Sequence, residues 1–180
     1  MTANIIDGKQ LAAQMRQEIK EEVEKLKKDN ITPGLAVVLV GEDPASKSYV
    51  TAKEKACHEA GIYSDDNRLP ENTSQKALMA LVDKLNNDPK IHGILVQLPL
   101  PSHLNESEVL LSINPDKDVD GFHPMNVGKM VVGEKAFLPC TPHGVIQMLI
   151  RSGVKLEGAE VVVVGRSNIV GKPVDRKSVV

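Results

Sequence analysis

The sequence predicts an α/β fold with a mostly parallel sheet. One observation is a set of apolar runs, at residues 35–40, 91–98 and 161–164, which are typical of strands covered on both faces. The other observation is that segments with helical spacing of apolar residues separate these runs. Strands that alternate with helices indicate βαβ units, and the strands of such units are parallel.

The first part of the chain predicts a helix, a strand, a second helix and a second strand. Apolar residues in 8–28 recur at steps of four and three behind the capping residue Asp7, so we expect an amphipathic helix. The run 35–40 is the first strand. A proline then opens a second helix over residues 45–60, and a glycine ends it. Residues 62–69 are a weaker strand candidate because polar residues interrupt them.

The middle of the chain predicts a third helix, a further strand and a short helix. Thr73 or Ser74 caps the third helix. Its expected buried stripe is Leu78, Leu81, Val82 and Leu85. Two prolines prevent the strand 91–98 from continuing beyond residue 98 in a sheet interior. Asn105, with a glutamate three residues later, predicts the start of a short helix to about residue 113.

Residues 114–139 are rich in proline, glycine and aspartate, which predicts loops and a domain boundary. We expect a first domain over residues 1–120 and a second over residues 121–180. A helix over residues 141–153 and a buried strand over residues 161–164 are the predicted elements of the second domain.

Composition excludes several classes of protein. The 180 residues include 22 Lys and Arg and 24 Asp and Glu, which gives a formal net charge of −2. This balance, with only two Tyr and two Phe, lacks the basic and aromatic features of nucleic-acid binding, so no nucleic-acid partner is expected. The length corresponds to between one and one and a half domains.

The sequence predicts a cytoplasmic protein without a membrane partner. Its first nine residues lack the pattern of a signal peptide, and its apolar runs are far shorter than a membrane span. The two cysteines, Cys57 and Cys140, form no C-x-x-C pair, so neither a disulfide framework nor a zinc site is expected. The five histidines also lack the spacing of metal ligands, and no metal is predicted.

A first group of candidate site residues follows the ends of predicted strands, where ligands bind in open α/β sheets. Tyr49 and Lys53 are four residues apart and so share one face of the second helix. A tyrosine can stack on a flat ring. A lysine can act as an acid or base near neutral pH when burial or a neighbouring donor lowers its pKa. Gln97 is a candidate for that donor, and Asp120 for an acceptor from an amino-substituted heterocycle.

Each of these residues also has an ordinary structural interpretation. Solvated helix lysines greatly outnumber catalytic ones, so spacing alone favours an unremarkable role for Lys53. Cys140 is a possible nucleophile, but its position between two prolines favours a loop that leads into a helix cap.

A second group, Gly165, Arg166 and Ser167, follows the run 161–164. A glycine turn between a strand and a helix presents backbone N–H groups to a phosphate. Arginine and serine suit an additional phosphate, which favours NADP over NAD. The spacing is not G-x-G-x-x-G, so a plain turn between a strand and a helix is an equally good interpretation of the pattern.

The chain carries four long motifs: G-E-D-P-A-S-x-x-Y-V-x-x-K at 41–53, H-G-I-L-V-Q-L-P-L-P at 92–101, P-x-K-D-V-D-G-F at 115–122 and G-R-S-x-x-V-G-x-P at 165–173. Together, in this order, they resemble the bifunctional methylenetetrahydrofolate dehydrogenase/methenyltetrahydrofolate cyclohydrolase family. The resemblance extends from residue 5 to about residue 174. It implies a folate-binding catalytic domain followed by the start of a Rossmann-like NADP-binding domain.

The resemblance implies an activity and residue roles. The reaction would be oxidation of methylenetetrahydrofolate by NADP, followed by hydrolysis of the methenyl product to formyltetrahydrofolate. Lys53 would be the acid/base group of the hydrolysis, Gln97 would tune and position it, Tyr49 would pack on the folate ring, and Asp120 would anchor the pterin. The folate cleft would be lined by Leu98, Pro99, Leu100 and Pro101. The cofactor phosphates would be held by Gly165, Arg166 and Ser167.

The family resemblance also implies a homodimer, tetrahydrofolate derivatives as ligands and a place in one-carbon metabolism that supplies purine, histidine and methionine biosynthesis. Residues 174–180 depart from the family, because three charges at 175–177 stand where a buried helix face is expected. This departure predicts a truncated form without NADP-dependent oxidation. Two alternatives are a non-catalytic folate-binding fragment and a Rossmann dehydrogenase with another substrate.

Overall fold

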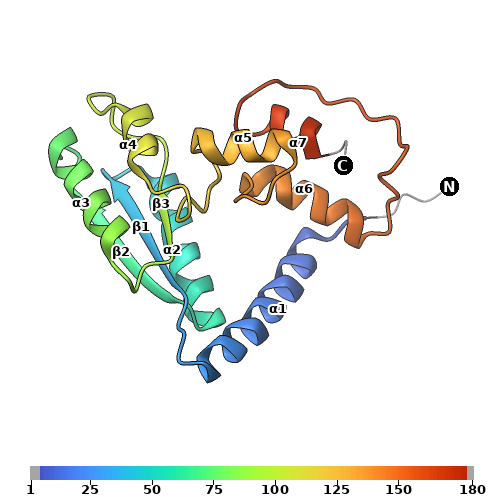
Figure 1. Cartoon of the computed structure of the whole chain (residues 1–180), viewed down its shortest axis with the longest axis horizontal. Helices are drawn as coiled ribbons and strands as arrows, with labels where there is room; N and C mark the ends of the chain where they lie inside the picture. The colour runs from blue at the N-terminus through green and yellow to red at the C-terminus, as the bar shows by residue number, and fades with distance from the viewer. Residues whose placement is uncertain (1–4, 178–180) are drawn as a thin grey trace. The chain divides into compact units, whose positions relative to one another are not determined.

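The computed structural model describes residues 5–177, which form two compact units. One unit consists of residues 16–119 and contains the sheet. The other consists of residues 5–15 together with residues 120–177 and is helical in the part described. The α/β fold class is confirmed (Figure 1).

The sheet has three parallel strands in the order β2-β1-β3. Strand β1 (Gly34–Val40) is central, β2 (Tyr63–Leu69) pairs along its whole length, and β3 (Gly93–Val96) pairs on the other side. The apolar run of β1 is buried because strands flank it and helices cover both of its faces. The weaker strand candidate is therefore confirmed as β2. It forms a strand because it pairs with β1, although its own sequence is polar.

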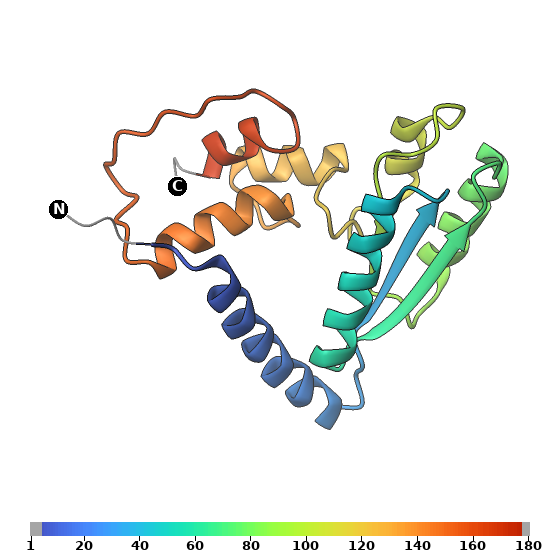
Figure 2. The same cartoon turned by 180° about the vertical axis from the view of Figure 1, so that it is seen from behind.

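Helices cover the two faces of this sheet (Figures 1 and 2). Helix α2 (Pro44–Ala60) packs Val50 against Val37, Leu39 and Leu95 on one face. Helices α3 (Gln75–Asn87) and α4 (Glu106–Ser112) cover the other face, where the larger core lies. That core joins alternate strand residues to the stripe predicted for the third helix; it includes Val38, Ile94, Leu78, Val82, Leu85 and Val109.

Helix starts and ends follow the local sequence. Ser74, not Thr73, caps α3, because its side chain accepts a hydrogen bond from the Ala77 amide. Asn105 caps α4 through the Glu108 amide. Gly61 ends α2 in the left-handed conformation with φ 78°. Helix α1 (Gly8–Lys28) has the predicted bounds, and its residues 8–15 belong to the helical unit.

The helical unit contains one helix that the sequence patterns did not indicate. Helix α5 (Pro124–Val132) lies inside the segment expected to be loops, with His123 as its cap and Gly133 at its end. Proline at the first helical position and glycine after the last are helix boundaries, but the same residues also suggest loops. Helices α6 (Cys140–Arg151) and α7 (Gly171–Lys177) complete the unit as described.

The buried strand predicted at residues 161–164 is wrong: these residues form no strand. Val162 and Val164 are 88% and 97% exposed. A strand must pair its backbone groups with a neighbour, and residues 120–177 contain no other strand in the described structure. High β propensity therefore does not produce a strand at this position.

Candidate active site

Helix α2 begins directly beyond the carboxyl end of β1, so its first residues lie at the edge of the sheet where ligands bind. The Asp43 side chain accepts a hydrogen bond of 2.7 Å from the Ser46 amide and so caps the helix. This hydrogen bond lowers the pKa of Asp43 below its ordinary value. Ser46 is buried at 3% exposure, which fixes the start of the helix.

Tyr49, Lys53 and Gln97 come together at this edge from two separate elements. Lys53 and Tyr49 lie on α2, and Gln97 follows the last residue of β3. Lys53 Nζ donates a hydrogen bond of 2.8 Å to Gln97 Oε1 and lies 5.6 Å from the centroid of the Tyr49 ring. Gln97 Nε2 donates in turn to the Leu98 carbonyl at 2.8 Å. The amine is thus held in a defined position, partly buried, beside an exposed aromatic ring.

The hydrogen bond corrects one expectation about Gln97. The sequence interpretation treated Gln97 as a donor to Lys53, whereas its amide oxygen accepts from Lys53. An ammonium group has three donors and no acceptor, so the amide must offer it an oxygen. An amide also carries an NH₂ group, so a rotated Gln97 could hold a neutral Lys53 as well. This pairing suits a lysine that exchanges a proton during a reaction.

The segment after Gln97 provides an apolar border next to this amine. The peptide bond between Leu98 and Pro99 is cis. Leu98, Leu100 and Pro101 are half-buried, while Pro99 is exposed. Leu100 packs against the larger core, which anchors the segment to the sheet. A flat ligand could contact this border and the exposed face of Tyr49.

Asp120 is the first residue of the helical unit after the sheet and lies beside Cys140. The distance from Cys140 Sγ to Asp120 Oδ1 is 3.9 Å, which is a weak thiol–carboxylate hydrogen bond. Gly121 brings the two segments close, because a Cβ there would lie 2.8 Å from the Phe137 carbonyl oxygen. Its φ of 66° also favours glycine. Cys140 is the first residue of α6, in agreement with its structural interpretation.

Lys117 is an important residue that the sequence interpretation did not single out. Its Nζ donates to three backbone carbonyls at the end of α3, those of Leu85 at 3.2 Å, Asn86 at 2.8 Å and Asp88 at 2.9 Å. Its own carbonyl accepts from the Ile94 amide at 2.7 Å. Lys117 therefore ties the loop before Asp120 to α3 and β3. A lysine in a proline- and aspartate-rich segment gives no sequence signal for such a role.

The turn at Gly165 is tight, although no strand leads into it. A Cβ at Gly171 would overlap the peptide between Gly165 and Arg166, so the chain folds tightly back on itself there. Ser167 Oγ accepts hydrogen bonds from the Val170 and Gly171 amides at 3.1 and 3.2 Å. Both amides are therefore satisfied within the turn by the chain's own serine. Arg166 is exposed next to them.

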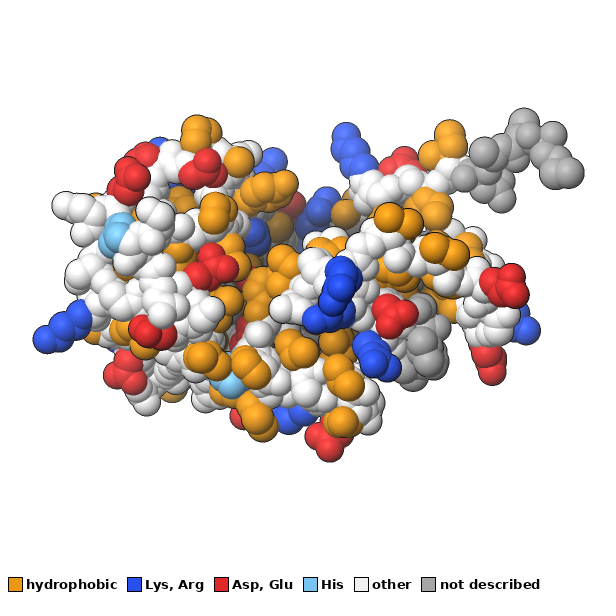
Figure 3. Space-filling view, turned by 90° about the horizontal axis from the view of Figure 1, so that it is seen from above, with side chains coloured by type: hydrophobic (Ala, Val, Ile, Leu, Met, Phe, Trp, Pro, Cys, Tyr) orange, Lys and Arg blue, Asp and Glu red, His pale blue; other side chains and the backbone are white. Residues whose placement is uncertain are grey.

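Residues 5–177 contain no cluster of three or more His, Cys, Asp or Glu side chains that could bind a metal ion. No helix in the same range is long and apolar enough to span a membrane. On the face shown in Figure 3, basic and acidic side chains are interspersed.

The fold and the Lys53–Gln97 pair define an α/β protein with a candidate acid–base site at the carboxyl edge of a parallel sheet. A model of the tetrahydrofolate dehydrogenase/cyclohydrolase catalytic domain matches residues 6–120. The model of the corresponding NAD(P)-binding domain matches residues 139–177. The chain belongs to the tetrahydrofolate dehydrogenase/cyclohydrolase family, which confirms the family predicted from the four motifs.

Curated relatives and solved structures agree with this assignment. The bifunctional protein FolD of Geotalea daltonii is 64% identical over 172 residues, covering 96% of this chain and 61% of that protein. FolD of Moorella thermoacetica is 61% identical over 174 residues, covering 97% and 62%. The chain thus spans about 61% of the length of the first of these relatives.

Two crystal structures illustrate the structural similarity. The bifunctional enzyme FolD, a methylenetetrahydrofolate dehydrogenase/cyclohydrolase from Campylobacter jejuni, matches with a TM-score of 0.95 and 49% identity, over 97% of this chain and 62% of that one. The Trypanosoma brucei enzyme, solved with NADP cofactor and an inhibitor, matches with a TM-score of 0.94 and 37% identity, over 99% and 62%.

Proposed function

We propose that this chain binds tetrahydrofolate derivatives and carries the acid–base group for hydrolysis of methenyltetrahydrofolate to formyltetrahydrofolate. The observation that carries the proposal is the 2.8 Å hydrogen bond between Lys53 and Gln97 beside the Tyr49 ring. Family membership supplies the substrate class, since the relatives and solved structures are named for this chemistry.

The hydrolysis needs one water molecule and one group that moves protons. Water attacks the methenyl carbon, a C–O bond forms, and the proton released from water passes to neutral Lys53 Nζ. The bond from that carbon to one ring nitrogen then breaks as the C=O bond of the formyl group forms. Lys53 returns its proton to the departing nitrogen, and the proton of the new hydroxyl group is released to solvent. Gln97 holds the amine in place through both steps. A base that is already positioned lowers the entropic cost of the reaction.

The other site residues bind and orient the substrate in this proposal. Tyr49 and the Leu98–Pro101 border contact the flat pterin and exclude water from part of the ring system. Asp120, as a carboxylate, accepts hydrogen bonds from the amino-substituted pterin. These roles stay predictions that rest on family membership and on the positions of the residues within their units.

We further propose that the family's dehydrogenase step uses NADP, with Gly165, Arg166 and Ser167 at its phosphates. Support comes from the match to the NAD(P)-binding model and from the exposed Arg166 beside the turn. The cofactor, when bound, would supply a hydride acceptor for the oxidation. Arginine provides a bidentate donor for a phosphate, so the chain's own contribution is to bind and orient the cofactor.

The test compares Lys53→Ala with the control Lys55→Ala, which removes a lysine exposed on the same helix. Hydrolysis is followed by the loss of methenyltetrahydrofolate absorbance at neutral pH. We expect Lys53→Ala to lose the enzyme-dependent rate, a decrease of at least about 100-fold, and Lys55→Ala to retain it. Equal rates in the two variants would remove Lys53 from its role.

A second candidate function is folate binding without oxidation. The observation that favours it is the absence of a strand before the Gly165 turn, within the part of the chain that is described. A saturable folate-binding signal together with no NADP-dependent oxidation of methylenetetrahydrofolate would support this alternative. Measurable oxidation would contradict it.

We also propose a homodimer in the cytoplasm, with β2 at the contact between two copies. In the described structure β2 has a strand neighbour on one side only. Ser64 Oγ and Asp66 Oδ1 are buried there, without a hydrogen-bond partner among the described residues. Light scattering should give twice the monomer mass, and a Ser64→Lys variant should shift it toward the monomer.

The proposed place in one-carbon metabolism, with supply to purine, histidine and methionine biosynthesis, also stays a prediction.

A further inference from the structure

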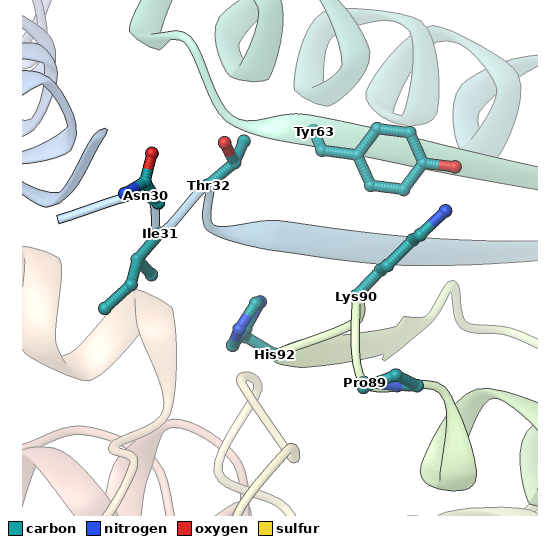
Figure 4. A pocket seen from close by; sticks show the side chains of 7 residues that line it. All are labelled: Asn30, Ile31, Thr32, Tyr63, Pro89, Lys90 and His92. Carbon is teal, nitrogen blue, oxygen red and sulfur yellow. The ribbon is translucent and has the colours of Figure 1, made fainter. Parts of the chain in front are cut away.

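A cavity of about 540 Å³ lies at the amino-terminal edge of the sheet. It is bordered by the link between α1 and β1, by the first residue of β2, and by the link between α3 and β3. The side chains that matter for its chemistry are Asn30, Ile31, Tyr63, Pro89, Lys90 and His92 (Figure 4). A volume of this size accommodates an organic molecule rather than a single ion or water.

This cavity is separate from the Lys53 site. Tyr63 pairs with Gly34 at the start of the sheet, and His92 precedes β3, whereas Gln97 follows the end of β3. The seven residues of β1 span roughly 20 Å between the two edges. A ligand in the cavity would therefore not contact the amine of Lys53.

The backbone fixes the ring of His92 as a donor toward this cavity. The Gly34 amide donates to His92 Nδ1 at 3.1 Å, and the His92 amide donates to the Gly34 carbonyl at 2.8 Å. A ring nitrogen that accepts a hydrogen bond carries no proton, so the proton of the neutral ring lies on Nε2. The ring is exposed, and its Nε2–H points away from Gly34. His92 thus offers a donor rather than an acceptor.

The charges of the cavity are one-sided. Lys90 is exposed and extends toward the ring of Tyr63 (Figure 4), and none of the lining residues is an aspartate or glutamate. The nearby Asp88 carboxylate accepts from the Lys90 backbone amide at 2.8 Å. The lining therefore presents an ammonium, an imidazole N–H and a phenol hydroxyl, next to the apolar surfaces of Tyr63, Pro89 and Ile31.

We propose that this cavity binds a small organic anion, specifically a carboxylate attached to a flat ring. Lys90 and the Nε2–H of His92 would donate to the carboxylate oxygens, in charge-assisted hydrogen bonds that are stronger than neutral ones. The ring of the ligand would stack on Tyr63 and contact Pro89. The site is independent of the proposed folate chemistry, because it uses neither Lys53 nor Gln97.

The experiment titrates the 180-residue chain with benzoate and follows backbone amide signals by NMR. Saturable shifts are expected at Gly34, Tyr63 and His92. Benzamide, which has the same shape without the charge, is expected to bind at least about 10-fold more weakly, because the charge-assisted contact is lost.

Variants at two lysines locate the charge requirement. Lys90→Gln should weaken benzoate binding about 10-fold, whereas Lys90→Arg should retain most of the affinity. The control Lys84→Gln removes an exposed lysine of α3, gives the same net charge as Lys90→Gln, and should leave the affinity unchanged. The proposal is overturned by any of three results: no saturable shift at these amides, equal affinity for benzoate and benzamide, or equal weakening by Lys90→Gln and Lys84→Gln. A folded variant is recognised by an otherwise unchanged amide spectrum.

Discussion

The two compact units contain valine-rich segments of very similar chemistry and place them in opposite environments. In the unit with the sheet, Val37 and Val38 of β1 are 1% and 0% exposed. In the helical unit, Val162 and Val164 are 88% and 97% exposed and belong to no strand. Both segments lead into a glycine, Gly41 and Gly165. The difference lies in the partners, because β1 has a strand on each side and helices on both faces.

This contrast shows that different interactions hold the two sites in place. The tertiary packing of the sheet holds the site at the sheet edge, and short-range hydrogen bonds hold the turn at Gly165. Gln97 follows β3, which pairs with β1 and contributes to the larger core, so its position beside Lys53 is fixed by the sheet. The Gly165 turn depends on its own short-range hydrogen bonds through Ser167. Matched residues of the two units should therefore respond differently to the same perturbation.

The largest effect is expected when a charge replaces a valine. Val38→Asp would bury an unpaired carboxylate in the larger core and should abolish cooperative folding of the sheet unit. Val162→Asp places the same group in solvent and should change the free energy of unfolding by less than about 0.5 kcal/mol. Urea denaturation followed by circular dichroism makes the measurement. A destabilised Val162→Asp variant would show that the segment is packed.

The two cysteines provide a comparison that needs no substitution. Cys57 is buried in the sheet unit, and burial raises the pKa of its thiol, whereas Cys140 is exposed. Native protein should therefore react with iodoacetamide at Cys140 at least about 100-fold faster than at Cys57. Peptide mass spectrometry over time measures both rates. Comparable rates would mean that α2 opens readily.

A smaller difference is expected between two lysines. Lys117→Met removes the donor to three carbonyls and should lower the free energy of unfolding by about 2 kcal/mol. Lys172→Met removes one exposed hydrogen bond to Asn168 and should cost less than about 0.5 kcal/mol. Both values come from urea denaturation. Equal losses would contradict the structural role given to Lys117.

The smallest effect concerns two serines, the cap of α3 and the turn residue before α7. Ser74→Ala should cost about 1 kcal/mol of global stability, since α3 belongs to the main core. Ser167→Ala removes two contacts at the seven-residue α7, and it should reduce amide protection locally at Val170 and Gly171 without a global change. Hydrogen exchange distinguishes the two outcomes. A global loss from Ser167→Ala would mean that the helical unit unfolds cooperatively through this turn.

Much of the fold was predictable because local patterns and tertiary partners agree in the sheet unit. The apolar run of β1, the Pro44 start of α2 and the stripe of α3 all indicate the structure that forms. Helix α5 was missed because its proline and glycine suggest a loop as readily as a helix boundary. The strand predicted at residues 161–164 is wrong because β propensity does not show whether a partner strand is present.

The candidate site was predictable to a similar degree. The four-residue spacing placed Tyr49 and Lys53 on one face of α2, and the structure brings Gln97 to the same place. The predicted direction of the Lys53–Gln97 hydrogen bond is wrong, because residue spacing does not show which group of an amide faces a lysine. The contacts of Lys117 with the end of α3 join residues about 30 positions apart, and no local pattern marks such a contact.

The most direct test of the central claim is an NMR titration of the chain with a tetrahydrofolate derivative. The claim is that folate binds at the carboxyl edge of the sheet, around Lys53. We expect saturable shifts of the Tyr49, Lys53 and Gln97 amides, and none at Lys90. A saturable shift confined to other residues, or no saturable shift at all, would contradict the claim.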